Sequence, residues 1–132
     1  MLVESLARTP ELMTLPSAAA RVVSALRHLV VASRAGRCPM SALSAKLGCV
    51  RGAAHLHLLL EEIGAAWPDP FAVSPPCCAR LSHDEALVAD MLALAERGKR
   101  PGFDRLLADL LPAETRERLF HSASVLLRVL GE

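Results

Sequence analysis

Residues 17–35 read SAAARVVSALRHLVVASRA, and this stretch decides the fold class. Its apolar residues recur every three or four positions, which is the period of an α-helix with one buried face. Gly36 suits the end of such a helix, because glycine tolerates the backbone conformation found there. Arg21, Arg27 and Arg34 are expected to lie outside the buried stripe. The expected stripe consists of Val22, Ala25, Leu26, Leu29 and Val30.

The same helical period recurs along the rest of the chain, where short connections separate the expected helices. Ser82 and Glu85 form the S-x-x-E pattern of a capping box, which marks a helix start. The chain is rich in Leu and Ala, good helix formers, whereas aromatic residues make up only 3%. We therefore expect an all-α protein: a compact bundle of five or six short helices, with a helix-turn-helix-like unit at 41–65. The further helices are expected at 41–47, 51–65, 82–97, 102–111 and 113–130.

The length of 132 residues suits one domain, so residues 1–132 are expected to form a single helical domain. Residues 1–15 are interrupted by Pro10 and are expected to be a loosely attached N-terminal segment. Residues 67–81 contain four prolines and cannot be helical throughout. Within them, residues 71–73 are expected to form one short extended piece.

Charge is distributed unevenly, although the net charge is only +1. Residues 12–60 contain no Asp or Glu, yet they carry several Arg, Lys and His residues. A basic half of this kind suits a nucleic acid, an acidic lipid surface or an acidic partner. The simpler interpretation is that the two halves attract one another across the fold.

Residues 41–64 read SALSAKLGCVRGAAHLHLLLEEIG and resemble the helix-turn-helix core of bacterial regulators. Ala45 and Gly48 sit where such cores place small residues, which let the two helices cross closely. Against DNA binding, the second helix is very apolar, and the chain contains no Asn or Gln to pair with adenine. The candidate nucleic-acid-binding residues are Arg21, Arg34, Arg37, Lys46, Arg51 and His55.

Residues 75–85, PPCCARLSHDE, are the most distinctive string in the chain. A disulfide between adjacent cysteines is strained and easily reduced, and the positive charge of Arg80 favours a thiolate. Cys77, Cys78 and His83 are therefore candidates for a reactive-thiol site or a metal site, in which Cys49 or Cys38 would complete the ligand set. The spacing is poor for zinc. The simpler alternative is that one cysteine packs inward and the other lies in the loop.

This segment also resembles a family of short bacterial helical proteins of uncharacterised function, a domain of unknown function. The resemblance implies a helical chain and implies no activity. The residues that carry it are Pro76, Cys77, Cys78, Arg80, Ser82, Asp84 and Glu85.

No nucleophile elbow, Walker loop, zinc-protease motif or dinucleotide fingerprint occurs, so we expect neither an enzyme nor a cofactor. The mean hydropathy of +0.33 is high for a soluble monomer and favours buried contacts with another chain. We therefore expect a non-enzymatic helical module for self-association or protein-partner binding. The alternatives are a helix-turn-helix DNA-binding regulator and a thiol- or metal-responsive site at Cys77 and Cys78.

Without a membrane span or a secretory signal, the sequence predicts a cytoplasmic protein with reduced thiols.

Overall fold

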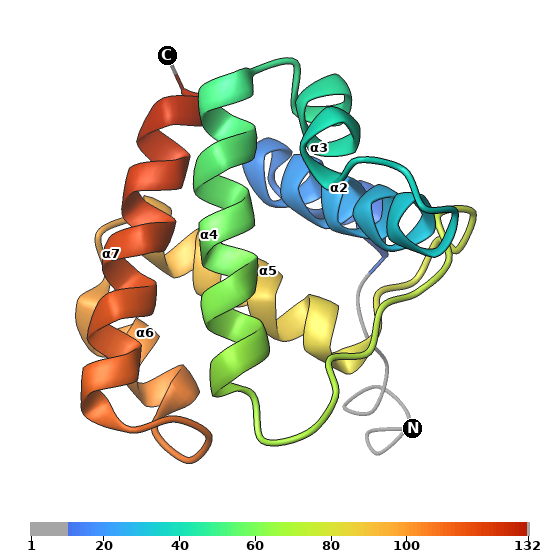
Figure 1. The fold of residues 1–132 in the computed structure, drawn as a ribbon. Coiled ribbons are helices and arrows are strands. Elements are labelled where there is room, and N and C mark those ends of the chain that lie inside the picture. The colour runs from blue at the N-terminus through green and yellow to red at the C-terminus, as the bar shows by residue number, and fades with distance from the viewer. Residues whose placement is uncertain (1–10, 132) are drawn as a thin grey trace.

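The computed structural model describes residues 11–131, and within them six α-helices follow one another (Figure 1). A short 3-10 helix, η1 (Leu12–Thr14), precedes them. No strand occurs in the described residues, so the expected all-α bundle of short helices is confirmed. The helices are α2 (Ser17–Arg34), α3 (Pro39–Leu47), α4 (Val50–Ala66), α5 (His83–Glu96), α6 (Arg100–Leu107) and α7 (Ala113–Leu130).

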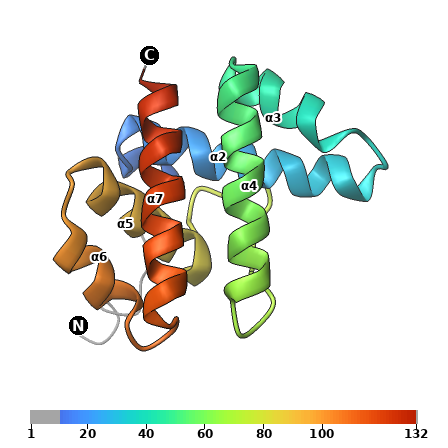
Figure 2. The same ribbon diagram turned by 60° about the vertical axis from the view of Figure 1, so that its left-hand side comes forward.

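Helices α4 and α7 lie side by side and antiparallel, while α2 runs across them (Figures 1 and 2). Where the first turn of α4 meets the end of α7, a Cβ atom at Gly52 would lie 2.9 Å from Cδ2 of Leu130. Glycine at this position therefore permits the close approach of the two helices. None of the helices in residues 11–131 combines the length and apolar character needed to span a membrane.

The core has two parts, and α2 contributes to both. The larger part includes Val22 and Ala25 of α2 together with leucines of α4, α5 and α7. The smaller part joins Ala19 and Val23 to Leu81 and Ala89. The buried surface of α2 is therefore wider than the single predicted stripe.

Most helix boundaries match the expected ones closely, because Pro, Gly and Ser end or cap the segments. Helix α3 begins two residues early, at Pro39, whose fixed backbone angle suits the first turn of a helix. Helix α6 begins at Arg100, and it ends at Leu107 rather than 111. The expected extended piece at 71–73 is not a strand: in the described residues the sole strand-like pairing is an isolated bridge between Glu11 and Arg80.

The expected N-terminal segment falls partly outside the described residues, which begin at Glu11. The described part contacts the rest of the chain. The Leu12 N–H donates to the Ala79 carbonyl at 2.7 Å, and Leu12 and Leu15 pack against the smaller core cluster. These contacts bring residues 11–15 against the loop that carries the two adjacent cysteines.

Candidate functional site

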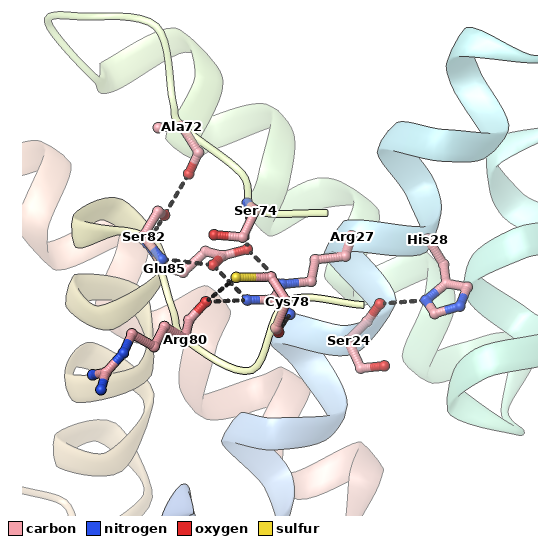
Figure 3. Close-up of polar contacts among 9 residues, drawn as sticks. All are labelled: Ser24, Arg27, His28, Ala72, Ser74, Cys78, Arg80, Ser82 and Glu85. Atoms are coloured by element: carbon pink, nitrogen blue, oxygen red, sulfur yellow. Dashed lines mark hydrogen bonds and ion pairs between the residues drawn. The ribbon is translucent and has the colours of Figure 1, made fainter. Parts of the chain in front are cut away.

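Two polar features border α2, and two consecutive residues of this helix contact them. Arg27 contacts the loop between α4 and α5, and His28 borders a groove between α2 and α3. Figure 3 shows Arg27 pointing toward the loop that carries Cys78, whereas His28 points away from it. We call residues 67–82 the Pro-Cys-Cys loop. The second feature is a groove between α2 and α3, bordered by His28.

The prediction that Arg27 lies outside the buried stripe is wrong, because the residue is only 1% exposed. Its Nε and Nη2 atoms donate to the two carboxylate oxygens of Glu85 at 2.9 and 3.0 Å. Nη1 donates to the Cys78 carbonyl at 2.7 Å, and Nη2 also donates to the Arg80 carbonyl at 2.9 Å. A buried guanidinium is stable only with partners of this kind, so Arg27 holds the loop against α2.

Glu85 is also fully buried and forms the predicted capping box with Ser82. The Ser82 N–H donates to its Oε1 at 2.8 Å, and the Ser74 N–H donates to its Oε2 at 3.1 Å. Burial alone would raise the pKa of Glu85, but hydrogen bonds from Arg27 and from these two N–H groups bring it below its usual value. The same contact with Glu85 raises the pKa of Arg27.

A second set of hydrogen bonds holds the loop to the start of α5. The Asp84 carboxylate accepts from Nε1 of Trp67 at 3.2 Å and from the Ala72 N–H at 2.7 Å. The Ser82 hydroxyl donates to the Ala72 carbonyl at 2.6 Å (Figure 3). The loop has no regular secondary structure, so these contacts satisfy backbone groups that a helix or strand would satisfy internally.

The two adjacent thiols lie at a tight turn of this loop. The turn is closed by the Cys78 N–H, which donates to the Pro75 carbonyl at 3.0 Å. Cys77 is exposed, whereas Cys78 is half-buried and its thiol donates to the Arg80 carbonyl at 3.3 Å. Both are free thiols, and the exposed His83 is the first residue of α5.

The structure does not assemble the metal site that the sequence suggested. Within residues 11–131, no three His, Cys, Asp or Glu side chains come close enough together to hold a metal ion. Cys38 precedes α3, and Cys49 caps α4 by accepting a hydrogen bond from the Gly52 N–H at 3.2 Å. Neither cysteine joins Cys77 and Cys78 in a cluster of ligands.

The groove between α2 and α3 has a volume of about 570 Å³, and we call it the basic groove. Arg37 and Lys46 are its exposed cations. Nδ1 of His28 lies 2.9 Å from the Ser24 carbonyl, which can only accept, so Nδ1 carries a hydrogen. The residues that line the groove are His28, Ala32, Arg37, Cys38, Ser41, Ala42, Ala45 and Lys46.

Cys38 introduces a thiol into this groove, at the position just before α3. The Cys38 side chain makes no helix-capping hydrogen bond. The backbone N–H of Ser41, the Ser41 side chain and the backbone N–H of Met40 nevertheless favour the thiolate, so the pKa of Cys38 is lowered. The thiol is exposed and therefore reports on access to the groove.

The six candidate nucleic-acid residues do not share one environment. Arg21 is half-buried, where it donates to the Leu47 carbonyl at 2.8 Å and to the Leu130 carbonyl at 3.4 Å, and so stabilises the ends of α3 and α7. Of the six, the basic groove brings together Arg37 and Lys46. The other exposed candidates are Arg34 and Arg51, and His55 is half-buried on α4.

Sequence reasoning missed Arg27 as the residue that organises the loop. It follows Ala19 and Val23 at intervals of four residues, and those two form the smaller core cluster. This interval puts all three on one helix face and is the signal that could have placed Arg27 inside. Ala45, expected at the helix crossing, is instead exposed and lines the basic groove.

Comparison of the chain with protein-family models, with curated protein sequences and with solved structures finds no significant match. The resemblance of the Pro-Cys-Cys segment to short bacterial proteins therefore stays a prediction.

Proposed function

We propose that the protein is a non-enzymatic binding module whose basic groove docks an acidic segment of a partner protein. The observation that carries this proposal is the set of residues that line the groove. Arg37, Lys46 and His28 are among them, and none of the lining residues is acidic. Residues 12–60, which include all of α2 and α3, contain no Asp or Glu. Carboxylates of a partner would therefore meet cations without competition from neighbouring acids.

The spacing of the cations suits a short acidic segment. Arg37 lies two residues before α3 and Lys46 lies in its last turn, so the two cations flank a helix whose nine residues span about 13 Å. Two acidic residues separated by two helical turns are about 11 Å apart, so they could approach both cations together. Ala42 and Ala45 also line the groove and offer small apolar side chains, which allow a partner backbone to approach closely.

DNA binding is the second candidate, and one observation favours it. Gly48 adopts a left-handed conformation, with φ of 69°, in the turn between α3 and α4, as the turn of a helix-turn-helix unit often requires. Against it, the exposed surface of α4 offers one arginine, Arg51, beside Val50 and Leu58, which are 71% and 57% exposed, and Glu61. Apolar and acidic side chains offer little to base edges or phosphates.

The test compares two probes on the full-length protein. One is a fluorescein-labelled peptide of about 12 residues that carries Glu at every third or fourth position and Ala or Leu elsewhere. As an α-helix, this peptide would be about 18 Å long. The other is a labelled DNA duplex. We expect saturable binding of the peptide that weakens with added salt, with amide NMR shifts concentrated at Ser41, Ala42 and Ala45. The peptide should also slow alkylation of Cys38 and leave alkylation of Cys77 unchanged.

A matched pair of variants separates the groove from general charge. Arg37→Glu with Lys46→Glu should weaken peptide binding about tenfold or more, because two attractive contacts become repulsive. Lys99→Glu with Arg105→Glu makes the same change in net charge at exposed positions outside the groove and should have little effect. Equal losses in the two variants, or preferential binding of the duplex, would refute the proposal. Self-association through the groove, seen as a dimer lost in the groove variant alone, would refute it too.

A further inference from the structure

The dithiol at Cys77 and Cys78 lies directly beside the contacts that hold the Pro-Cys-Cys loop to α2. The Cys78 residue is fixed twice: Arg27 donates to its carbonyl at 2.7 Å, and its thiol donates to the Arg80 carbonyl at 3.3 Å. Cys77 is the exposed member of the pair and is open to solvent reagents. Both contacts of Cys78 belong to the reduced loop.

We propose that Cys77 and Cys78 form a reversible modification site, a dithiol that low-molecular-weight disulfides oxidise to a disulfide that loosens the loop from Arg27. This inference rests on the loop alone and is independent of the basic groove. It assigns a role to the two cysteines that the binding function does not use.

The chemistry proceeds by two thiol–disulfide exchanges. The Cys77 thiol loses its proton, and the resulting thiolate attacks one sulfur of the small disulfide. This forms a mixed disulfide and releases one small thiolate, which takes up a proton. The Cys78 thiolate then attacks the Cys77 sulfur and releases the second small thiolate. In total, two protein thiols become one disulfide, and one small disulfide becomes two small thiols.

The geometry of the reduced loop opposes this disulfide. Adjacent Cα atoms are about 3.8 Å apart, which is below the usual range for disulfide-bonded residues. The Cys78 sulfur must also leave the Arg80 carbonyl to reach Cys77. Because the native loop favours the dithiol, the disulfide must weaken the native loop by the same free energy. A strained disulfide of this kind is readily reduced, which is the property of a reversible site and not of a structural crosslink.

Oxidation therefore has a consequence beyond the two sulfurs. The peptide between Cys77 and Cys78 must deform, and the Cys78 carbonyl is one of the four acceptors of the buried Arg27. The neighbouring Ala79 carbonyl accepts from Leu12, so residues 11–15 depend on the same stretch of loop. We expect the oxidised protein to hold both the loop and this segment less firmly.

The experiment uses the full chain carrying Cys38→Ser and Cys49→Ser, so that the pair alone reacts. The protein is equilibrated with reduced and oxidised glutathione at a series of ratios, and its intact mass, peptide map and thermal unfolding are measured. We expect a loss of two hydrogen atoms confined to the peptide with Cys77 and Cys78. We also expect a lower unfolding temperature that a reductant restores. Two single-thiol controls, Cys77→Ser and Cys78→Ser made separately in the same background, should each gain the mass of at most one glutathione.

An Arg27→Lys variant tests the coupling, because lysine cannot make all four hydrogen bonds of the guanidinium. Its disulfide should form at a glutathione ratio at least about tenfold more reducing than in the parent. If this variant does not fold, the difference in unfolding temperature between the oxidised and reduced parent decides the matter. The proposal fails if native protein accepts only glutathione without closing the disulfide. It also fails if closure leaves the unfolding temperature unchanged, or if folded Arg27→Lys oxidises at the parent ratio.

Discussion

Arg27 and Glu85 are 58 residues apart in the chain, and their side chains meet in a buried pair with contacts of 2.9 and 3.0 Å. Each member of the pair also binds backbone: Arg27 holds two loop carbonyls, and Glu85 holds two N–H groups. A buried ion pair by itself is a weak source of stability, because desolvation offsets the attraction. The backbone contacts make this pair the organiser of a loop that has no regular structure.

Removal of one partner should be costly. Arg27→Met leaves the Glu85 carboxylate buried without its cation, and we expect a loss of about 3–5 kcal/mol in the free energy of unfolding. Arg27→Lys keeps the charge but loses part of the hydrogen bonding, so its loss should be smaller. Urea unfolding followed by circular dichroism measures both.

The double variant Arg27→Met with Glu85→Leu distinguishes the ion pair from the backbone contacts. Where an ion pair is isolated, replacing both members by apolar residues is often neutral or stabilising. Here four backbone groups would lose buried partners, so we expect the double variant to remain at least about 2 kcal/mol less stable than the parent. A double variant as stable as the parent would show that the loop backbone does not depend on this pair.

The pair should also give stability a particular pH dependence. The pKa of Glu85 is lower in the folded protein than its ordinary value of 4.5. A lowered pKa means that the unfolded chain binds the proton more tightly, so this contribution is fully present above about pH 4.5 and is lost as the pH falls through the folded value. Above pH 5, the parent should exceed Glu85→Gln in stability by a constant amount, and the difference should shrink on acidification.

Urea unfolding at several pH values between 3 and 7 measures this difference. Glu117→Gln, at an exposed position on α7, is the matched control and should follow the parent within about 0.5 kcal/mol throughout. A difference between the parent and Glu85→Gln that grows on acidification would contradict the sign derived from the lowered pKa.

The helices were predictable because they are encoded locally. Leu and Ala at helical spacing, with Pro, Gly or Ser at the ends, define each segment from within, and Ser82 with Glu85 marks the start of α5 in four residues. Arg27 was not predictable in the same way, since its carboxylate partner is far away in the sequence. A charged residue is normally placed at the surface unless such a partner is known.

The basic groove illustrates the same limit. The sequence predicts that Arg37 and Lys46 are both candidate contacts, but their common groove depends on how α2 packs against α3. Charge alone predicts the same role for Arg21, but its guanidinium donates instead to carbonyls at the ends of two helices. Local sequence identifies a cation, whereas the crossing of the helices decides which surface it joins.

The cap of α4 offers a test at a third cysteine. The Cys49 sulfur accepts a hydrogen bond from the Gly52 N–H at 3.2 Å, but serine is a much preferred residue at this position. Cys49→Ser should therefore raise the free energy of unfolding by about 0.5–1 kcal/mol, and Cys49→Ala should lower it by a similar amount. Cys77→Ser is the control, because the exposed Cys77 makes the same chemical change in a loop and does not precede a helix. If serine and alanine at position 49 have equal effects, the sulfur does not act as a cap.

Gly64 lies within α4 and Gly48 lies just before it. Replacing each by alanine should change the free energy of unfolding in opposite directions. Gly64 has helical neighbours and open space around a Cβ atom, so Gly64→Ala should stabilise the protein by about 0.5–1 kcal/mol through a smaller loss of backbone entropy. Gly48 has equally open space, but its φ of 69° is a left-handed conformation that costs alanine about 1–2 kcal/mol. Because neither side chain would meet a neighbour, the contrast isolates backbone conformation from packing. Thermal unfolding of the two variants beside the parent measures it, and a shift of the same sign in both would mean that the turn between α3 and α4 does not hold Gly48 in that conformation.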